Sequence, residues 1–254
     1  MFHESQHWYD LVYDAQGKDY VGESRQLQRL FAGHGLSPET MGRRPRWLDV
    51  ACGTGRHLAH LPEFDRVGID LDPAMLEVAA ARCPCVPFEV GDMRSLKRTR
   101  GATIPASDSD GRFDVVTCLF SAIAYMQDLE ELEVAIGAMA DRVADGGLLV
   151  VEPFLTPEVV VAGRPSMNVI DSEDLKLVRM DVPRIDGRRL RLEFHYLSAT
   201  VDGVEHRVEP HLISIFSVEE IGDAFRRAGL AWHHDSAGLS ERGLHLGTKG
   251  PAVP

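Results

Sequence analysis

Two short segments near residue 50 combine backbone freedom with an acidic side chain, as a nucleotide site requires. Residues 47–55 form an apolar run that ends in Gly53-Thr54-Gly55. This pattern predicts a strand followed by a helix whose first backbone N–H groups stay open to a ligand. Residues 68–72 contain a second apolar run, which ends at Asp70. A carboxylate at that place can hold the two hydroxyl groups of a ribose.

The spacing of the glycines indicates which nucleotide is bound. A dinucleotide-binding turn needs Gly-x-Gly-x-x-Gly, and Leu58 stands where the third glycine should be. Asp49, on the strand before the turn, and the small residue Ala51 give the order acidic-x-small-x-Gly-x-Gly. This order resembles the first motif of class I S-adenosylmethionine (SAM) methyltransferases. Because SAM has no pyrophosphate, small residues such as Gly53 and Gly55 let the backbone pass under its methionine and ribose.

The resemblance to SAM methyltransferases extends farther along the chain. It implies that Asp70 binds the ribose, that Asp92 holds the adenine amino group, and that the main chain at Met93 holds the adenine ring. Asp72-Pro73 are expected to open the next helix as its N-cap and first helical residue. Three motifs in this order at these spacings favour a ligand site over a bare strand–helix–strand unit.

Composition excludes several classes of function. The chain has 254 residues and a formal net charge of -12, which argues against a nucleic-acid substrate because phosphates require a basic surface. A small anionic substrate remains open if a few arginines gather locally. Four cysteines without paired C-x-x-C spacing are expected to be reduced thiols. No membrane-length apolar run or signal peptide is recognised, so we expect no membrane partner and a cytoplasmic location.

The alternation of elements predicts one α/β domain over residues 1–254, with a doubly wound sheet of seven strands. The expected helices are 55–61, 73–82, 128–144 and 218–228, and the expected strands are 46–51, 66–70, 86–90, 113–119, 148–153, 230–234 and 243–248. Residues 1–35 are expected to form a helical lid over the SAM cleft. Residues 97–111, rich in Ser, Asp, Gly and Pro, are expected to form a surface excursion.

Local signals mark the boundaries of the later elements. Residues 189–196 alternate polar and apolar side chains, and Asp-Gly pairs flank them at 186 and 202. This pattern predicts an antiparallel β insertion over 155–216, after the fifth strand and covering the acceptor site. Helix 128–144 is expected to stop at Gly146-Gly147. Ser217-x-x-Glu220 predicts a capping box.

The flanking segments are more specific than the SAM motif. The chain resembles bacterial dTDP-amino-sugar N,N-dimethyltransferases of macrolide biosynthesis at residues 9–20, 49–57, 118–126, 151–158 and 240–247. The resemblance implies a seven-stranded class I methyltransferase that methylates the amine of a nucleotide-linked sugar, with two successive methylations expected. It also implies a homodimer.

Site roles follow from the same resemblance. Tyr20 and Arg25 would close on SAM near its methionine part, and the main chain at Ala51 and Leu119 would hold the amino acid. The residues expected at the acceptor are Tyr13 and Tyr125, facing the sugar, and Phe154, Arg179 and Arg242, holding the nucleotide diphosphate. Some relatives have His at the position of Tyr125, and many have two aromatic residues where this chain has Phe154-Leu155.

Tyr13 and Tyr125 are the catalytic candidates, because their hydroxyls can orient an amine. A strong general base is not required, and none is identified. Two alternatives stay open: a methyltransferase with another small acceptor, such as a sugar hydroxyl or free amine, and a non-catalytic SAM-binding protein. The sequence His-Glu-x-x-His at residues 3–7 lacks the downstream ligand and buried helix of a zinc site, so no metal is expected.

Overall fold

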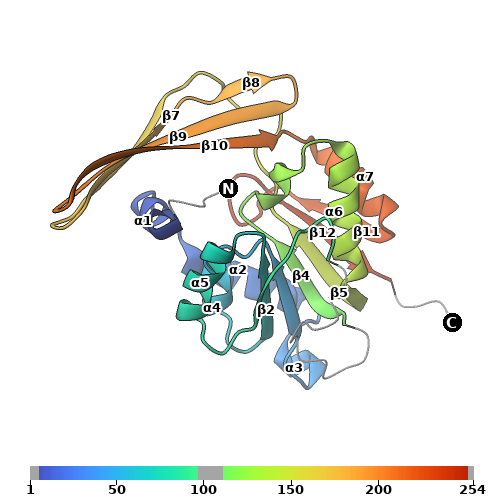
Figure 1. Cartoon of the computed structure of the whole chain (residues 1–254). Helices are drawn as coiled ribbons and strands as arrows, with labels where there is room; N and C mark the ends of the chain where they lie inside the picture. Colours follow the sequence, from blue (N-terminus) through green and yellow to red (C-terminus); the bar gives the residue numbers. More distant parts are fainter. Residues whose placement is uncertain (1–5, 97–110, 251–254) are drawn as a thin grey trace.

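The computed structural model describes residues 6–96 and 111–250, and they form a three-layer α/β core with a second sheet above it (Figure 1). The core sheet has seven strands in the order β11-β12-β5-β4-β1-β2-β3. The strands are β1 (Arg46–Val50), β2 (Asp65–Asp70), β3 (Phe88–Val90), β4 (Phe113–Cys118), β5 (Val143–Val151), β11 (Leu230–Asp235) and β12 (Leu244–Lys249). Only β12 runs antiparallel to both of its neighbours. The predicted fold class is confirmed.

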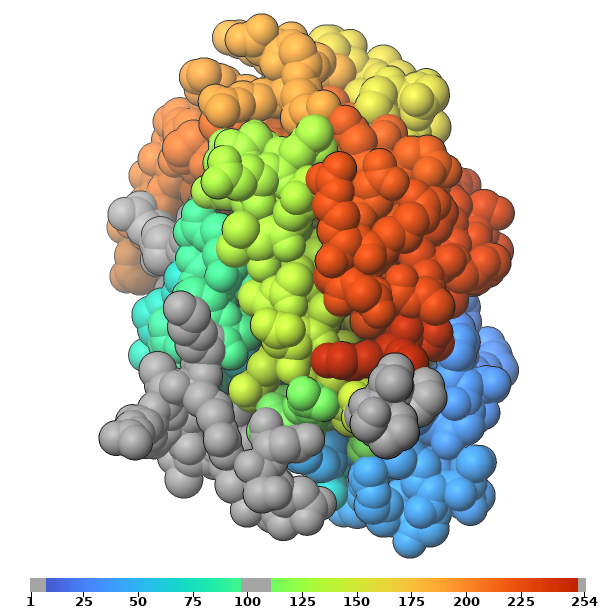
Figure 2. Space-filling view, turned by 90° about the vertical axis from the view of Figure 1, so that its right-hand side faces the viewer, coloured from blue at the N-terminus to red at the C-terminus, as the bar shows by residue number. Residues whose placement is uncertain are grey.

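Helices cover both faces of the core sheet. One face packs against α6 (Leu129–Asp141) and α7 (Val218–Arg227) through a buried apolar cluster. These two helices lie side by side in Figure 2, below the second sheet. The other face carries α2 (Tyr20–Gly33), α4 (Arg56–Ala59) and α5 (Pro73–Arg82). A short helix, α3 (Pro38–Met41), leads into β1.

The second sheet lies between β5 and α7 in the chain, inside the predicted insertion. Its strands are β6 (Ser166–Asp171), β7 (Lys176–Asp181), β8 (Arg184–Asp186), β9 (Arg189–Thr200) and β10 (Gly203–Ser214), in the order β10-β9-β7-β6 with β8 on β9. All the pairings are antiparallel. Its inner face packs on α1 (Gln6–Ala15), where Trp8 and Val12 meet Tyr196. Helix α1 therefore lies between the second sheet and the core.

The expected N-terminal helical segment is divided in two. Gly17 separates α1 from α2 with a φ of 75°, a left-handed conformation that glycine adopts without strain. Asp19 caps α2, since its carboxylate accepts from the backbone N–H of Gly22 at 2.8 Å. The break lets α1 and α2 pack on different parts of the molecule.

The expected stop of the helix over 128–144 is wrong. Helix α6 ends at Asp141, and Gly146 and Gly147 belong to β5. The register between β4 and β5 shifts there, which marks a β-bulge. A side chain on Gly147 would lie 2.8 Å from the carbonyl oxygens of Ala144 and Asp114. The two glycines therefore allow close backbone packing in a strand. Glycine has this role in strands as well as its role at helix ends.

Other boundaries agree with the sequence within a few residues. The Ser217 hydroxyl accepts from the N–H of Glu220, and the Glu220 carboxylate accepts from the N–H of Ser217, so the capping box is confirmed. The predicted helix at 55–61 is shorter, because α4 covers only Arg56–Ala59. The expected excursion at 97–111 and the start of the His-Glu-x-x-His motif lie outside the described residues, apart from Gly111 at the end of the excursion.

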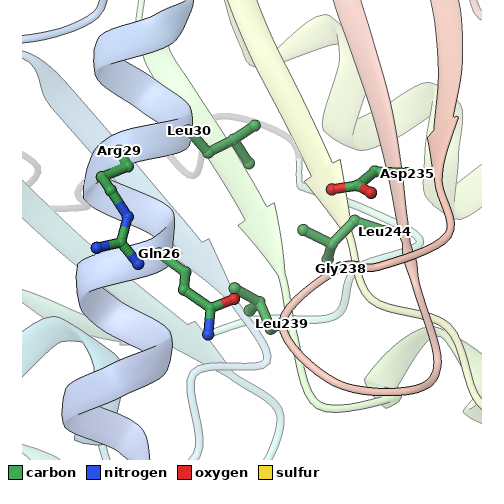
Figure 3. A pocket seen from close by; sticks show the side chains of 7 residues that line it. All are labelled: Gln26, Arg29, Leu30, Asp235, Gly238, Leu239 and Leu244. Atoms are coloured by element: carbon green, nitrogen blue, oxygen red, sulfur yellow. The ribbon is translucent and has the colours of Figure 1, made fainter.

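Two further observations concern the described part of the chain. No helix in it is long and apolar enough to cross a membrane. A groove of about 280 Å³ lies between α2 and the β11–β12 loop, lined by Gln26, Arg29, Leu30, Asp235, Gly238, Leu239 and Leu244 (Figure 3). None of these residues belongs to the predicted SAM or acceptor site, so the groove is a separate surface feature.

Candidate active site

The glycine-rich turn after β1 is open and tied to the end of β2. Ala51, Gly53 and Gly55 have φ values of 58°, 54° and 72°. A side chain on Gly53 would meet no atom within 4 Å, so there is open space beside this residue. The Asp70 carboxylate accepts from the N–H of Gly53 at 2.8 Å and from the N–H of Asp72 at 2.9 Å. The turn and carboxylate thus form one unit that fits the ribose and methionine of SAM.

Asp49 lies below this turn. It is 2% exposed, and its carboxylate accepts from the Thr117 hydroxyl at 2.6 Å. The Trp47 indole in turn donates to that hydroxyl at 2.8 Å. Burial raises the pKa of Asp49 to about 6, while His57 and the Thr117 hydrogen bond oppose the rise. Asp49 therefore supports the turn from below.

Tyr20, the first residue of α2, packs at the side of the same turn. Its ring contacts the His57 ring edge-on with centroids 5.2 Å apart, and the Arg56 guanidinium lies 4.5 Å from its centroid. His57 Nε2 lies 2.8 Å from Glu23 Oε2, which fixes this corner. Arg25, the other residue expected near the methionine, is exposed on α2 and is not on the buried face that carries Tyr20.

Two carboxylates of α1 hold this helix to the SAM turn. Asp10 accepts from the Thr54 hydroxyl at 2.8 Å and from Arg82 Nη2 at 2.5 Å. Asp14 forms an ion pair with Arg56, one residue after the turn. Neither Asp10 nor Asp14 is among the site residues predicted from the sequence. Both lie in the segment 9–20, and the family resemblance of that segment could have pointed to them.

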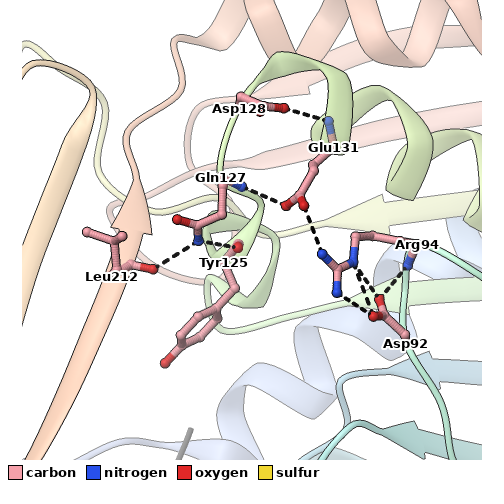
Figure 4. A network of polar contacts seen from close by, with 7 residues as sticks. All are labelled: Asp92, Arg94, Tyr125, Gln127, Asp128, Glu131 and Leu212. Carbon is pink, nitrogen blue, oxygen red and sulfur yellow. Dashed lines mark hydrogen bonds and ion pairs between the residues drawn. The ribbon is translucent and has the colours of Figure 1, made fainter.

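A polar network connects the expected adenine site to the acceptor side (Figure 4). Asp92 receives hydrogen bonds from the Arg94 guanidinium, which lowers the pKa of Asp92. Arg94 also donates to Glu131 at 2.8 Å, and Glu131 accepts from the N–H of Gln127 at 2.9 Å. The Gln127 amide donates to the carbonyl of Tyr125 at 2.8 Å. The network therefore links the position of Asp92 to the segment that carries Tyr125.

Met93 and Leu119 line the same side of the core. Met93 packs partly buried against the apolar cluster under α6, and Leu119 is buried after the end of β4. Their main chains follow β3 and β4, so both stand at the carboxyl ends of strands. Ligands of open α/β sheets bind at this edge.

Phe120 stands at the centre of the acceptor side and is not among the site residues predicted from the sequence. Its ring contacts the Tyr13 ring edge-on with centroids 4.8 Å apart, and the Arg242 guanidinium lies 5.3 Å from its centroid. The backbone of Phe120 has a φ of 53°, a strained conformation for a residue with a side chain. Glu152 holds this turn, since its fully buried carboxylate accepts from the Phe120 N–H at 2.7 Å and lies 3.5 Å from Arg242.

Arg179 reaches the acceptor side from the second sheet. It is 5% exposed, and its guanidinium carbon lies 5.5 Å from the Tyr13 ring centroid and 4.4 Å from that of Phe194. Nη2 donates to the Asn168 amide oxygen at 3.0 Å, whereas Nε and Nη1 have no hydrogen-bond partner among the described residues. A buried guanidinium with free donors suits an anionic ligand.

Tyr125 lies in a 3-10 turn, η1 (Ala122–Tyr125), and is 36% exposed. Its hydroxyl is 2.8 Å from His211 Nδ1, and burial raises its pKa well above the usual value. Electrostatic repulsion from Tyr13 adds a smaller contribution to the same rise in pKa. Phe154 packs beside η1 against an apolar cluster that includes Leu190 and Ala124.

The structure thus brings most of the predicted residues to one edge of the core sheet. The fold, the open turn and the Asp70 carboxylate define a class I SAM-dependent methyltransferase. A sequence profile described as a methyltransferase domain matches residues 48–147. The chain belongs to the dTDP-amino-sugar N,N-dimethyltransferase family, as its relatives show.

Three relatives are similar over nearly their whole length. The dTDP-3-amino-3,6-dideoxy-alpha-D-glucopyranose N,N-dimethyltransferase of Streptomyces fradiae is 36% identical over 95% of this chain and 89% of its own. The dTDP-3-amino-3,4,6-trideoxy-alpha-D-glucopyranose N,N-dimethyltransferase of Streptomyces venezuelae is 35% identical, over 94% and 95%. A SAM-bound amino pentose methyltransferase of Micromonospora echinaspora, involved in calicheamicin biosynthesis, matches with a TM-score of 0.79 at 30% identity, over 95% and 96%.

Proposed function

We propose that this protein methylates, twice in succession, the amino group of a dTDP-linked deoxyamino sugar in antibiotic biosynthesis. The observation that carries the proposal is the line Arg179, Tyr13, Phe120, Arg242, in which two arginines flank two aromatic rings in contact beside the SAM turn. The relatives named above act on acceptors of this chemistry. The arrangement offers cations for a diphosphate and an aromatic surface for a sugar.

The diphosphate is proposed to lie against Arg179 and Arg242, with Phe154 beside it. The free Nε and Nη1 of Arg179 are donors that a phosphate oxygen can accept from. Glu152 lies beside Arg242 and fixes the direction of its guanidinium. A charge-assisted hydrogen bond of this kind contributes about 1.5–3 kcal/mol.

SAM supplies a methyl group on a sulfonium, which is a good leaving group. We propose that Asp70 holds the ribose, Asp92 and Met93 the adenine, and the backbone at Ala51 and Leu119 the amino acid. Tyr20 and the turn residues Gly53 and Gly55 complete this cofactor site, with Asp49 supporting the turn from below. Arg25 is proposed to join them only if its exposed side chain turns inward.

The protein's own contribution to the reaction is alignment. The acceptor amine must be neutral, because a protonated amine has no lone pair. Burial in the cleft disfavours the charged amine, and the Tyr13 and Tyr125 hydroxyls are proposed to orient it. Proximity and orientation of this kind contribute on the order of 7–11 kcal/mol in good intramolecular models.

Helices α1 and α2, over residues 1–35, are proposed to act as the lid of the SAM site, and residues 155–216 as the cover of the acceptor site. Asp10 and Asp14 support the first role, since they hold α1 to residues of the SAM turn and its neighbours. Trp8 and Tyr196 support the second, since their rings connect the lid to the second sheet with centroids 5.5 Å apart. A closed cleft excludes water from the amine.

We further propose that the protein forms a homodimer and acts in the cytoplasm. The outer face of the second sheet supports the dimer, because Met167 pairs with Met180 and Val178 with Leu197 on that face. Of these four, all but Val178 are exposed. An apolar row on a sheet can bury itself against a second copy around a two-fold axis. Light scattering of the purified protein, with Met180→Glu as the disrupting variant, tests this assembly.

Acceptor discrimination tests the proposed function. The protein is given SAM and either a dTDP-amino sugar, the same dTDP-sugar with a hydroxyl in place of the amine, or the amino sugar without the nucleotide. We expect turnover with the first acceptor, none with the second and a much raised KM with the third. Methylation of the hydroxyl would instead favour an O-methyltransferase.

Nucleotide binding can be tested apart from turnover. Titration calorimetry with dTDP should show a loss of affinity of about tenfold or more in Arg179→Met, since one charge-assisted contact is removed. Arg164→Met, at an exposed position outside the site, is the matched control. Equal affinity in all three proteins would exclude Arg179 from the diphosphate site.

A further inference from the structure

Two buried polar residues of the second sheet stand behind Tyr125. Glu209 and His211 are two apart on β10, so both side chains point to its inner face, toward the core. They are 6% and 2% exposed. His211 Nδ1 lies 2.8 Å from the Tyr125 hydroxyl, and its Nε2 lies 3.9 Å from Glu209 Oε2, which is an electrostatic contact beyond hydrogen-bond distance. The three residues form a line that runs from the cleft into the sheet.

Apolar side chains border this pair on the inner face of the second sheet. Ile213, the next inward residue of β10, is buried and apolar, and so is Leu190, its register partner on β9. Phe194 packs on the His211 ring with centroids 4.8 Å apart. Burying a carboxylate and an imidazole costs free energy, and their attraction across 3.9 Å offsets only a part of that cost.

The surroundings of His211 determine which of its ring nitrogens carries the proton and in which direction the Tyr125 hydroxyl donates. Burial lowers the pKa of His211, so the ring is neutral near neutral pH and carries one N–H. The negative charge of Glu209, 3.9 Å from Nε2, attracts an N–H and repels a lone pair, so it favours the tautomer with the proton on Nε2. Nδ1 is then an acceptor, and the Tyr125 hydroxyl must donate to it. The lone pairs of the Tyr125 oxygen are left for the cleft.

We propose that Glu209 and His211 are positioning residues that make the Tyr125 hydroxyl a hydrogen-bond acceptor for the substrate amine. This inference rests on the proposed N-methyltransferase function. An amine N–H that donates to Tyr125 keeps its lone pair free, and the lone pair can point at the methyl group. A hydroxyl that donated to the amine would occupy that lone pair and block the reaction.

Rescue by a conservative variant tests the role of His211. In His211→Asn the amide oxygen can replace Nδ1 as the acceptor, whereas His211→Leu offers none. We expect kcat of His211→Leu to fall about tenfold or more, since amine orientation is lost. His211→Asn should keep most of the activity, and the Kd for SAM should be unchanged in both. Equal losses in Asn and Leu would overturn the proposal.

A double-mutant cycle separates positioning from a structural role. If His211 acts through Tyr125, His211→Leu should have almost no further effect in a Tyr125→Phe background. The same fold-loss in both backgrounds would overturn the proposal, because a structural defect does not depend on the hydroxyl.

A measurement without turnover keeps the inference apart from the proposed function. Nitrogen NMR of the imidazole in the SAM-bound protein reports which nitrogen carries the proton. We expect the proton of His211 on Nε2 in the parent protein and a change in Glu209→Gln. A proton on Nδ1 in the parent would overturn the inference whatever the acceptor is, and failure to methylate any amine with the expected tautomer would overturn only the proposed function.

Discussion

His245 makes the stability of this fold depend on pH. It is fully buried in β12, where its Nδ1 accepts from the Trp232 indole at 3.1 Å and its ring lies 4.9 Å from that of His234. Burial lowers its pKa to about 3, with a smaller contribution from His234. The folded protein therefore holds His245 neutral, whereas the unfolded chain protonates it below pH 6.5.

The size of the change in the free energy of unfolding follows from the difference in the pKa of His245 between the folded and unfolded states. The unfolded state binds one more proton than the folded state between pH 6.5 and pH 3, so the free energy of unfolding falls as the pH is lowered through that window. Each pH unit is worth about 1.4 kcal/mol for one group, so the loss reaches about 2 kcal/mol at pH 5. This is a large part of a typical stability of about 5–15 kcal/mol.

His245→Asn tests this reasoning, because the amide oxygen can still accept from Trp232 but does not titrate. Urea unfolding at pH 8 and pH 5 should show a parent that loses about 2 kcal/mol more than the variant does. His233→Asn, at an exposed neighbouring position, should keep the slope of the parent. Equal pH slopes in the parent and His245→Asn would refute the assignment. Asp49, whose pKa is raised to about 6, increases the free energy of unfolding as the pH falls, and it does so equally in the parent and both variants.

Three further predictions concern the SAM side. Asp70→Asn should weaken SAM binding about tenfold to a hundredfold by calorimetry, because a charged acceptor is lost; an unchanged Kd would exclude the ribose contact. Gly68→Ala should lower stability by about 1–3 kcal/mol, since its Cβ would lie 2.6 Å from the Phe88 ring. The matched control Gly137→Ala, in open space on α6, should raise stability by about 0.5–1 kcal/mol. Equal changes in the free energy of unfolding for the two variants would contradict the close contact of Gly68 with Phe88. Asp10→Ala should speed hydrogen exchange in α1, because the helix loses its hydrogen bond to Thr54; unchanged exchange would show that Asp10 does not hold α1 in place.

Local chemistry made much of the fold predictable. Asp70 follows an apolar run and ends a strand, as expected, and the glycines after β1 form the open turn. Ser217 and Glu220 signalled a helix start through side-chain hydrogen bonds between near neighbours. Alternation over residues 189–196 identified β9, because the two faces of that strand have different surroundings.

Tertiary contacts explain what the sequence left open. The Tyr125 hydroxyl meets a histidine 86 residues away, and no periodicity reports such a pair. Gly146-Gly147 was expected to end a helix but permits a bulge, since glycine serves both uses. Arg179 and Leu177 are two apart on β7 and share the face of the strand that α1 covers, so both are buried; the sequence alone does not show that α1 lies there.

The mass of the product formed from SAM and a dTDP-amino sugar tests the central claim most directly. The purified protein is incubated with both, SAM binding is verified in the same sample, and the sugar nucleotide is weighed by mass spectrometry over time. We expect a transient gain of one methyl mass followed by a stable gain of two, located on the nitrogen by fragmentation. No gain on any amino sugar, in a sample that binds SAM, would contradict it.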